Sequence, residues 1–186
     1  AAIAVEEAIE AGADTLIRVG SSGSMQPHIH TGDVVVVSAA IRDEGTTPYY
    51  LPIEFPAVAD IEVVNALREA AERLGYKSHT GIAQSKDSFY GEVERARMPM
   101  PARLAERWNA FITGGAACSE MESSALFILS SIYRKRAGGV MLVINESDLA
   151  EVDEDNPAKH MAEFDADRVI KVAVEALKIL IQSDRR

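Results

Sequence analysis

The stretch Thr15-Leu-Ile-Arg-Val-Gly-Ser-Ser-Gly23 decides the fold class, because a short β-prone run stops here at a segment rich in glycine and serine. The residues before it, Ala1 to Gly12, are rich in Ala and Glu, and their composition favours a helix that ends at the glycine. A helix, a glycine and a buried strand in this order are typical of half a βαβ unit. Residues 1–23 therefore predict an α/β protein.

The rest of the chain continues this alternation of strands and helices. The run Val34-Val-Val-Val-Ser38 is too apolar for a sheet with one wet face, so the sheet should be covered on both faces. We expect one domain over residues 1–186, with a mixed, mostly parallel central sheet flanked by helices. The further elements that we expect are helices at 60–74, 122–133 and 158–183, strands at 77–84 and 140–144, a loop at 43–56 and an irregular stretch at 86–103.

Composition excludes several classes of function. The 186 residues carry 19 Lys and Arg against 29 Asp and Glu, a net charge of −10, which disfavours nucleic acid and anionic membranes as partners. No apolar run approaches the roughly 20 residues that span a bilayer. One cysteine cannot form an intrachain disulfide, so we expect a soluble protein of a reducing compartment such as the cytoplasm. The pair His28 and His30 lacks further ligands at useful spacing, and we expect no metal.

Arg18 is the first candidate functional residue. An arginine near the end of an apolar strand is costly to bury unless it meets an anion, and the following glycines and serines can turn N–H and O–H donors toward one. Strand ends are also where ligands bind in open α/β sheets. The alternative is an ordinary turn in which Arg18 pairs with a structural carboxylate. Both interpretations stay open at this point.

Two further motifs also allow two interpretations each. In Ser119-Glu-Met-Glu-Ser123, the spacing of Ser119 and Glu122 favours a capping box at a helix start, although a carboxylate here could accept hydrogen bonds from a sugar. In Asp87-Ser-Phe-Tyr90, Phe89 could stack on a flat heterocycle, although core packing is the commoner role of a phenylalanine. The glycine motifs of dinucleotide-binding and P-loop proteins are absent.

Taken together and in order, five segments resemble the nucleoside phosphorylase family, and most of all its uridine phosphorylases. Each segment alone is weak, but the ordered set is specific and covers nearly the whole chain. The segments are Asp14-Thr-Leu-Ile-Arg-Val-Gly-Ser-Ser-Gly23, Gln26-Pro-His-Ile-His-Thr-Gly-Asp33, Pro52-Ile-Glu-Phe-Pro-Ala-Val-Ala-Asp60, Asp87-Ser-Phe-Tyr90 and Glu120-Met-Glu-Ser-Ser-Ala-Leu-Phe127.

The resemblance implies a three-layer fold and a reversible phosphorolysis. Orthophosphate, as co-substrate and without a further cofactor, would attack the anomeric carbon of a nucleoside and give a free base and a pentose 1-phosphate. Such enzymes serve nucleoside salvage and catabolism, and they form dimers that commonly assemble into hexamers. By similarity, the phosphate would bind Arg18 and Ser21, the ribose would bind Met121 and Glu122, and the base would contact Phe89, Arg95, Val143 and Ile144. The large apolar residues of the loop Tyr49–Pro56 also favour an interface.

The chain departs from the family pattern at three places. The family's first strands, with a Gly-Asp-Pro loop and its arginine, do not precede Ala1, which allows a non-catalytic nucleoside-binding subunit as an alternative. Val93 stands where uridine phosphorylases have a Gln that reads uracil, whereas Arg95 keeps its place. Asn145 stands where purine enzymes have an Asp, which favours a pyrimidine site, unless Asp148 substitutes. A purine nucleoside phosphorylase or a nucleosidase of the same fold is a further alternative.

Overall fold

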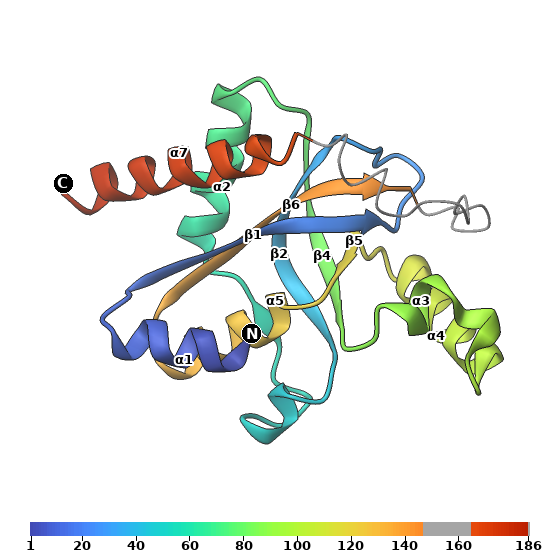
Figure 1. The fold of residues 1–186 in the computed structure, drawn as a ribbon. Helices are drawn as coiled ribbons and strands as arrows, with labels where there is room; N and C mark the ends of the chain where they lie inside the picture. Colours follow the sequence, from blue (N-terminus) through green and yellow to red (C-terminus); the bar gives the residue numbers. More distant parts are fainter. Residues whose placement is uncertain (147–164, 186) are drawn as a thin grey trace.

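The computed structural model describes residues 1–146 and 165–185 (Figure 1). Its strands are β1 (Thr15–Ser24), β2 (Val34–Asp43), β3 (Ala57–Val58), β4 (Ser78–Lys86), β5 (Cys118–Glu120) and β6 (Arg136–Asn145). Its α-helices are α1 (Ala2–Glu10), α2 (Ile61–Arg73), α3 (Tyr90–Val93), α4 (Pro101–Thr113), α5 (Ser123–Ile132) and α7 (Asp167–Asp184), and two short 3₁₀ helices lie at η1 (Thr47–Tyr49) and η2 (Arg95–Arg97).

The strands form one mixed sheet in the order β3-β2-β4-β5-β1-β6. The two longest pairings, β1 with β6 and β2 with β4, are parallel, as the sequence predicts. The sheet does not stay open, because β6 also pairs antiparallel with β2, with Val34 opposite Leu142 and Val37 opposite Gly139. The predicted α/β class with a mixed, mostly parallel sheet is therefore confirmed, with the addition that the sheet partly closes into a barrel-like ring.

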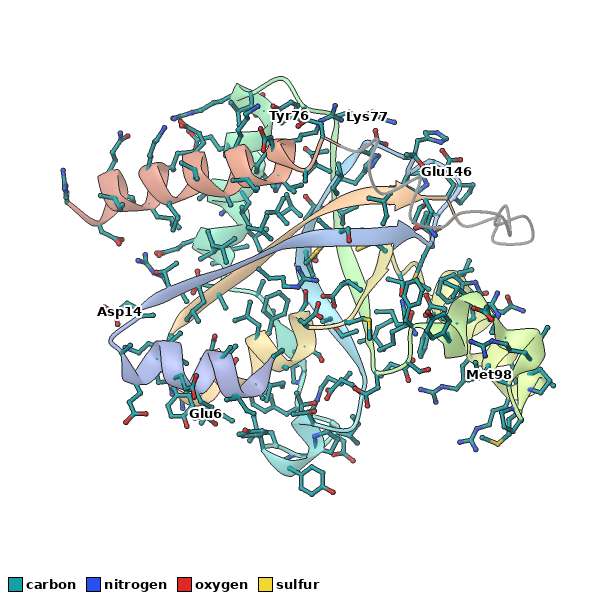
Figure 2. All side chains as sticks on the ribbon, in the orientation of Figure 1. Glu6, Asp14, Tyr76, Lys77, Met98 and Glu146 are labelled. Carbon is teal, nitrogen blue, oxygen red and sulfur yellow. The ribbon has the colours of Figure 1, made fainter. Side chains whose placement is uncertain are left out.

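Helices cover both sides of this ring, and side chains fill the space between the layers (Figures 1 and 2). Helices α2 and α7 pack together on one side, and α1 packs with α5 on the other. The four valines that begin β2 are fully buried, which agrees with the expectation of a sheet covered on both faces. Asp60 caps α2 by accepting hydrogen bonds from the backbone N–H groups of Glu62 and Val63, at 2.9 and 3.3 Å. Within residues 1–146 and 165–185, every helix is too short or too polar to span a bilayer.

The predicted elements differ most from the structure at two segments. Strand β1 does not stop at Gly20 but runs through the Gly-Ser-Ser-Gly segment to Ser24, because Leu142 and Val143 of β6 pair with this segment. The stretch 86–103, expected to be irregular, contains α3 and η2 and the start of α4. Helix α4 begins at Pro101, a position where the missing N–H of proline costs no hydrogen bond, and its Trp108 packs in a small second core. Helices α3 and α4 lie beyond the end of β4 (Figure 1).

A polar cluster fixes the start of β2. Asp33 accepts hydrogen bonds from Lys77 Nζ and His79 Nε2, both at 2.8 Å, and from the backbone N–H of His30 at 3.1 Å. Burial disfavours the charged form of Asp33, but these hydrogen bonds outweigh it and lower the pKa of the carboxyl group. His30 itself lies 3.3 Å from Glu146, which follows β6 (Figure 2). The other histidine of this loop, His28, packs edge-to-face against His79 of β4, with ring centroids 5.7 Å apart.

Candidate functional site

Arg18 extends along β1 and crosses directly over Gly20. A Cβ atom on Gly20 would lie 1.7 Å from Arg18 Nη1, so only glycine leaves room for this path. Nη1 donates to the carbonyl of Val19 at 2.8 Å, and Nη2 donates to Glu122. Arg18 Nε lies 3.6 Å from Glu120 Oε2, yet it is buried and has no hydrogen-bond partner among the described residues. The guanidinium group is therefore held between two carboxylates, and its buried Nε donor makes no hydrogen bond with the described residues.

Glu120 is the fully buried member of this pair of carboxylates. It accepts hydrogen bonds from the Ser85 hydroxyl and from the backbone N–H groups of Glu122 and Ser123, the latter two at 2.9 and 3.0 Å. Glu120 thereby satisfies the first N–H groups of α5, where a negative charge also meets the positive end of the helix dipole. The capping box that the spacing of Ser119 and Glu122 favours is wrong, because the Ser119 hydroxyl points to Lys86, Gln84 and Glu92 instead.

The side chains of Arg18 and Ser21, the two residues expected to bind phosphate, project from opposite faces of β1. Side chains alternate along a strand, and the pairing of β1 with β6 is regular from Thr15 to Ser22, so Arg18 and Ser21 point to different sides. Ser21 is exposed, whereas Ser22, on the side of Arg18, is buried. The structure thus brings Arg18 together with Glu122 but leaves the Ser21 side chain apart from them.

The residues expected at the ribose and the base differ in exposure. Met121 and Glu122 are both partly exposed at the turn between β5 and α5. Phe89 is 51% exposed and packs edge-to-face against Tyr90, with ring centroids 5.5 Å apart, so it is not a core residue. Val143 is fully buried in the main core, and the adjacent Ile144 is partly exposed.

Asn145 ends β6 beside β1. Its side-chain oxygen lies 2.9 Å from the position of a Cβ atom on Gly23, so this glycine makes room for the amide. Gly23 and Asn145 are also paired across the strands, at an irregularity in their register. Asp148, the alternative acid of a shifted loop, lies outside the described residues.

A cavity of about 180 Å³ lies where β4 meets α3 and α4. Arg95, the predicted base contact, lines it, and its guanidinium carbon stacks 5.1 Å from the centre of the Trp108 ring. Arg95 Nη1 is buried without a hydrogen-bond partner in the described part of the chain. The wall carries charges of both signs, and its other residues are Asp43, Gln84, Lys86, Asp87, Ser88, Gly91, Glu92, Leu104 and Arg107.

Lys86 and Glu92 form a buried ion pair on this wall, and both are residues that sequence reasoning missed. Lys86 Nζ donates to Glu92 Oε1 at 2.7 Å and to the Ser119 hydroxyl at 2.5 Å. The only signal in the sequence was a lysine two residues after the predicted strand 77–84. Its partner comes from α3, a helix that the sequence did not predict.

Strand β5 connects the two parts of the site. Ser119 points to the cavity with Lys86 and Glu92, whereas the next residue, Glu120, points to Ser85 and Arg18. Glu120 ends β5 and Lys86 ends the parallel strand β4, so both parts lie at the carboxyl ends of strands. An anion, a polyol and a flat ring could thus be bound next to one another along this edge.

Comparison with known proteins places this arrangement in context. The family model described as the Phosphorylase superfamily matches residues 1–183. Uridine phosphorylase of Treponema pallidum (strain Nichols) is 48% identical over 184 residues, which cover 98% of this chain and 69% of that protein. Uridine phosphorylase of Escherichia coli (strain K12) is 37% identical over 96% of this chain and 70% of its own length. Guanosine phosphorylase of Halorubrum lacusprofundi is 32% identical over 97% of this chain and 71% of its own length. The chain spans 64–71% of the length of its relatives.

Proposed function

The chain belongs to the phosphorylase superfamily, and from this premise we propose that it catalyses the reversible phosphorolysis of a pyrimidine nucleoside, as a uridine phosphorylase does. A phosphate oxygen forms a bond to the anomeric carbon of the pentose, while the bond from that carbon to the base nitrogen breaks. The base leaves with the electron pair of the broken bond and then takes up a proton. Orthophosphate is the co-substrate, and the proposal includes no other cofactor.

The observation that carries this proposal is the setting of Arg18. The guanidinium group is partly buried, is aligned by Gly20 and keeps a buried donor, Nε, that lies 3.6 Å from Glu120 Oε2 and makes no hydrogen bond with the described residues. A phosphate dianion would supply the acceptor that Nε lacks, with a charge-assisted hydrogen bond. The alternative of a purely structural ion pair accounts for the contacts of Arg18 with carboxylates, but it leaves Nε without a hydrogen bond.

Glu122 supports the ribose part of the proposal. Its carboxylate is partly exposed and already lies against the Arg18 guanidinium, so a hydroxyl donor bound there would sit beside the phosphate. In a reaction through an oxocarbenium-like transition state, positioning of the two reactants and stabilisation of charge are the main tasks of the protein. Arg18 and Glu122 together would hold the two reacting groups side by side. Met121 completes the ribose contacts in this proposal.

The remaining assignments concern the second phosphate contact and the base. In the proposal, Phe89 stacks on the base, Arg95 donates to a base carbonyl, and Ile144 contributes an apolar wall that is backed by the buried Val143. The exposed ring of Phe89 and the unpartnered donor of Arg95 support the first two roles. The Ser21 side chain projects from the face of β1 opposite to Arg18. In the proposal, Ser21 therefore contacts the phosphate only through its backbone N–H or after a rearrangement of β1.

A purine substrate is the second candidate, and the similarity to a guanosine phosphorylase favours it. Against it stands Asn145, since an amide cannot donate a proton to a leaving purine as a carboxylic acid can. The pyrimidine assignment is therefore the better supported one.

The proposal also covers assembly and location. Tyr49, which is 92% exposed, and Ile53 and Phe55 present apolar surface on the loop after β2, which suits an interface between copies in a dimer and then a hexamer. Arg42 holds this loop with hydrogen bonds to three of its carbonyl groups, so the apolar surface is preformed. The lone, buried thiol of Cys118 suits the cytoplasm.

The test is the release of free base from uridine, inosine, guanosine and adenosine, each measured with and without orthophosphate. We expect uracil release that depends on phosphate and little turnover of the purine nucleosides. Turnover of purine nucleosides alone would overturn the pyrimidine assignment. Equal rates with and without phosphate would make the protein a nucleosidase, and no turnover at all would leave a nucleoside-binding subunit.

A further inference from the structure

The cavity beside α3 and α4 contains more recognition chemistry than Arg95. It is small compared with the roughly 300–1,000 Å³ of pockets for drug-sized ligands, and its size suits a single ring rather than a whole nucleoside. Its wall holds a buried carboxylate, Glu92, a buried ammonium, Lys86, and an indole, Trp108. Polar groups that converge on a pocket fix the orientation of the molecule that binds there.

Glu92 lines the cavity and has one carboxylate oxygen without a hydrogen bond among the described residues. Its side chain is 9% exposed, and its Oε1 accepts from Lys86 at 2.7 Å and lies 2.8 Å from the Ser119 hydroxyl. Its Oε2 has no hydrogen-bond donor in the part of the chain that the structure describes. A carboxylate oxygen accepts hydrogen bonds, so Oε2 is an acceptor that a ligand N–H can use.

Arg95 supplies a donor to the same cavity. Its Nη1 is buried and unpartnered among the described residues, and stacking on Trp108 fixes the plane of the guanidinium group. A free acceptor and a free donor on one wall are complementary to a ring N–H next to a ring carbonyl. Uracil and thymine carry this imide edge, whereas the corresponding ring nitrogen of cytosine carries a lone pair and no proton.

Resting on the proposed function, we propose that Glu92, held in place by Lys86, is the residue that reads the base, and that it selects a pyrimidine with an N–H at ring position 3. Glu92 accepts from this N–H while Arg95 donates to the neighbouring carbonyl oxygen. Glu92 thus takes over the hydrogen bonding that is lost with Val93, which has no polar atom in its side chain. Lys86 is a positioning residue that fixes the Glu92 carboxylate.

A carboxylate at position 92 discriminates between uridine and cytidine more strongly than an amide would. Ionised, it only accepts hydrogen bonds, so it repels the lone pair of cytosine, whereas an amide can turn and donate to that lone pair. The variant Glu92→Gln keeps the shape and the contact with Lys86 but gains this ability. We therefore expect it to bind uridine and cytidine with similar affinity.

The experiment measures the binding of uridine, 3-methyluridine and cytidine without phosphate, through the fluorescence of Trp108. This residue is the single tryptophan of the chain and lines the cavity, so its emission reports directly on the occupant. In the wild-type protein we expect uridine to bind at least about tenfold more tightly than either analogue, because each analogue leaves Oε2 without its donor. Phosphorolysis of uridine is measured in parallel.

Three variants complete the design. In Glu92→Gln, the preference for uridine over cytidine should fall by about tenfold. In the double variant Lys86→Met with Glu92→Met, which removes both buried charges together, the preference for uridine over 3-methyluridine should disappear. Glu94→Gln is the matched control, because Glu94 is exposed on the same segment and pairs with Arg97 outside the cavity. It should keep both wild-type preferences. Thermal melts show whether each variant folds.

The outcomes separate this inference from the proposed function. Wild-type preferences in folded Glu92→Gln and in the double variant would overturn the inference, even if uridine is phosphorolysed. Turnover of uridine with no response of Trp108 would also overturn it, because the base would then bind elsewhere. Loss of discrimination in the variants, combined with no phosphorolysis by the wild type, would support the role of Glu92 and contradict the proposed reaction alone.

Discussion

The substitution Gly20→Ala tests the geometry of the Arg18 site most specifically, because it changes no polar group. A Cβ atom at position 20 would lie 1.7 Å from Arg18 Nη1, 2.5 Å from Cζ and 2.7 Å from Nη2. Ordinary contact begins at 3.4 Å, so the guanidinium group must move by about 1.7 Å. The colliding atoms are the far end of a flexible side chain, so the strand itself can stay in place.

The expected result is a loss of phosphate binding without a loss of stability. A displaced guanidinium gives up at least one charge-assisted hydrogen bond, about 1.5–3 kcal/mol, which corresponds to a roughly 10- to 150-fold fall in kcat/KM for phosphate. The free energy of unfolding should change by less than about 1 kcal/mol. Steady-state kinetics with varied phosphate and urea denaturation measure the two quantities.

Two further variants make this result interpretable. Gly45→Ala is the control, since its Cβ would meet only Asp87 Oδ2, at 3.4 Å. Arg18→Lys keeps the charge but not the planar fork, and it should lower kcat/KM for phosphate as Gly20→Ala does. If Gly20→Ala and Arg18→Lys both fold and bind phosphate like the wild type, the assignment of Arg18 to phosphate is refuted.

Three other predictions concern stability and reactivity. The pKa of Asp33 is lowered from 3.8, so its contribution to stability is fully present above pH 3.8 and is lost as the pH falls further. Acid unfolding of the variant Asp33→Asn should therefore depend less on pH than acid unfolding of the wild type. Gly138→Ala would place a Cβ atom 2.4 Å from Val63 Cγ1, between β6 and α2. It should lower the free energy of unfolding, measured in urea, by about 1–3 kcal/mol. An unchanged free energy of unfolding would contradict the close packing of β6 on α2. Burial raises the pKa of the Cys118 thiol to about 12, so a disulfide reagent at pH 8 should label it only after unfolding, and rapid labelling of the native protein would show that β5 is accessible.

The sequence predicts the alternation of elements well, because the apolar strands and the amphipathic helices have clear periodicity. It fails at the Gly-Ser-Ser-Gly segment, where glycines suggest a turn but pairing with β6 satisfies the backbone. It fails again at α4, where two Met-Pro pairs suggest irregular chain. The second proline is in fact the first residue of the helix, and the apolar side chains of Trp108 and Phe111 could have revealed its buried face.

The sequence identifies some residues of the candidate site but not others. Arg18 and Glu122 are identified by their resemblance to a family, although 104 positions separate them and only the fold shows their contact. Glu120 was not singled out, because its partners include Ser85 on another strand. Lys86 and Glu92 were missed for the same reason: a buried ion pair has no local signature, and one partner lies on a helix that was not predicted.

The central claim is that phosphate itself becomes bonded to the pentose. Phosphorus NMR of the protein with uridine and orthophosphate tests this directly. The account predicts that a new phosphate ester, the pentose 1-phosphate, grows in step with free uracil and disappears again when excess uracil is added. Release of uracil with free pentose and no phosphate ester would contradict it.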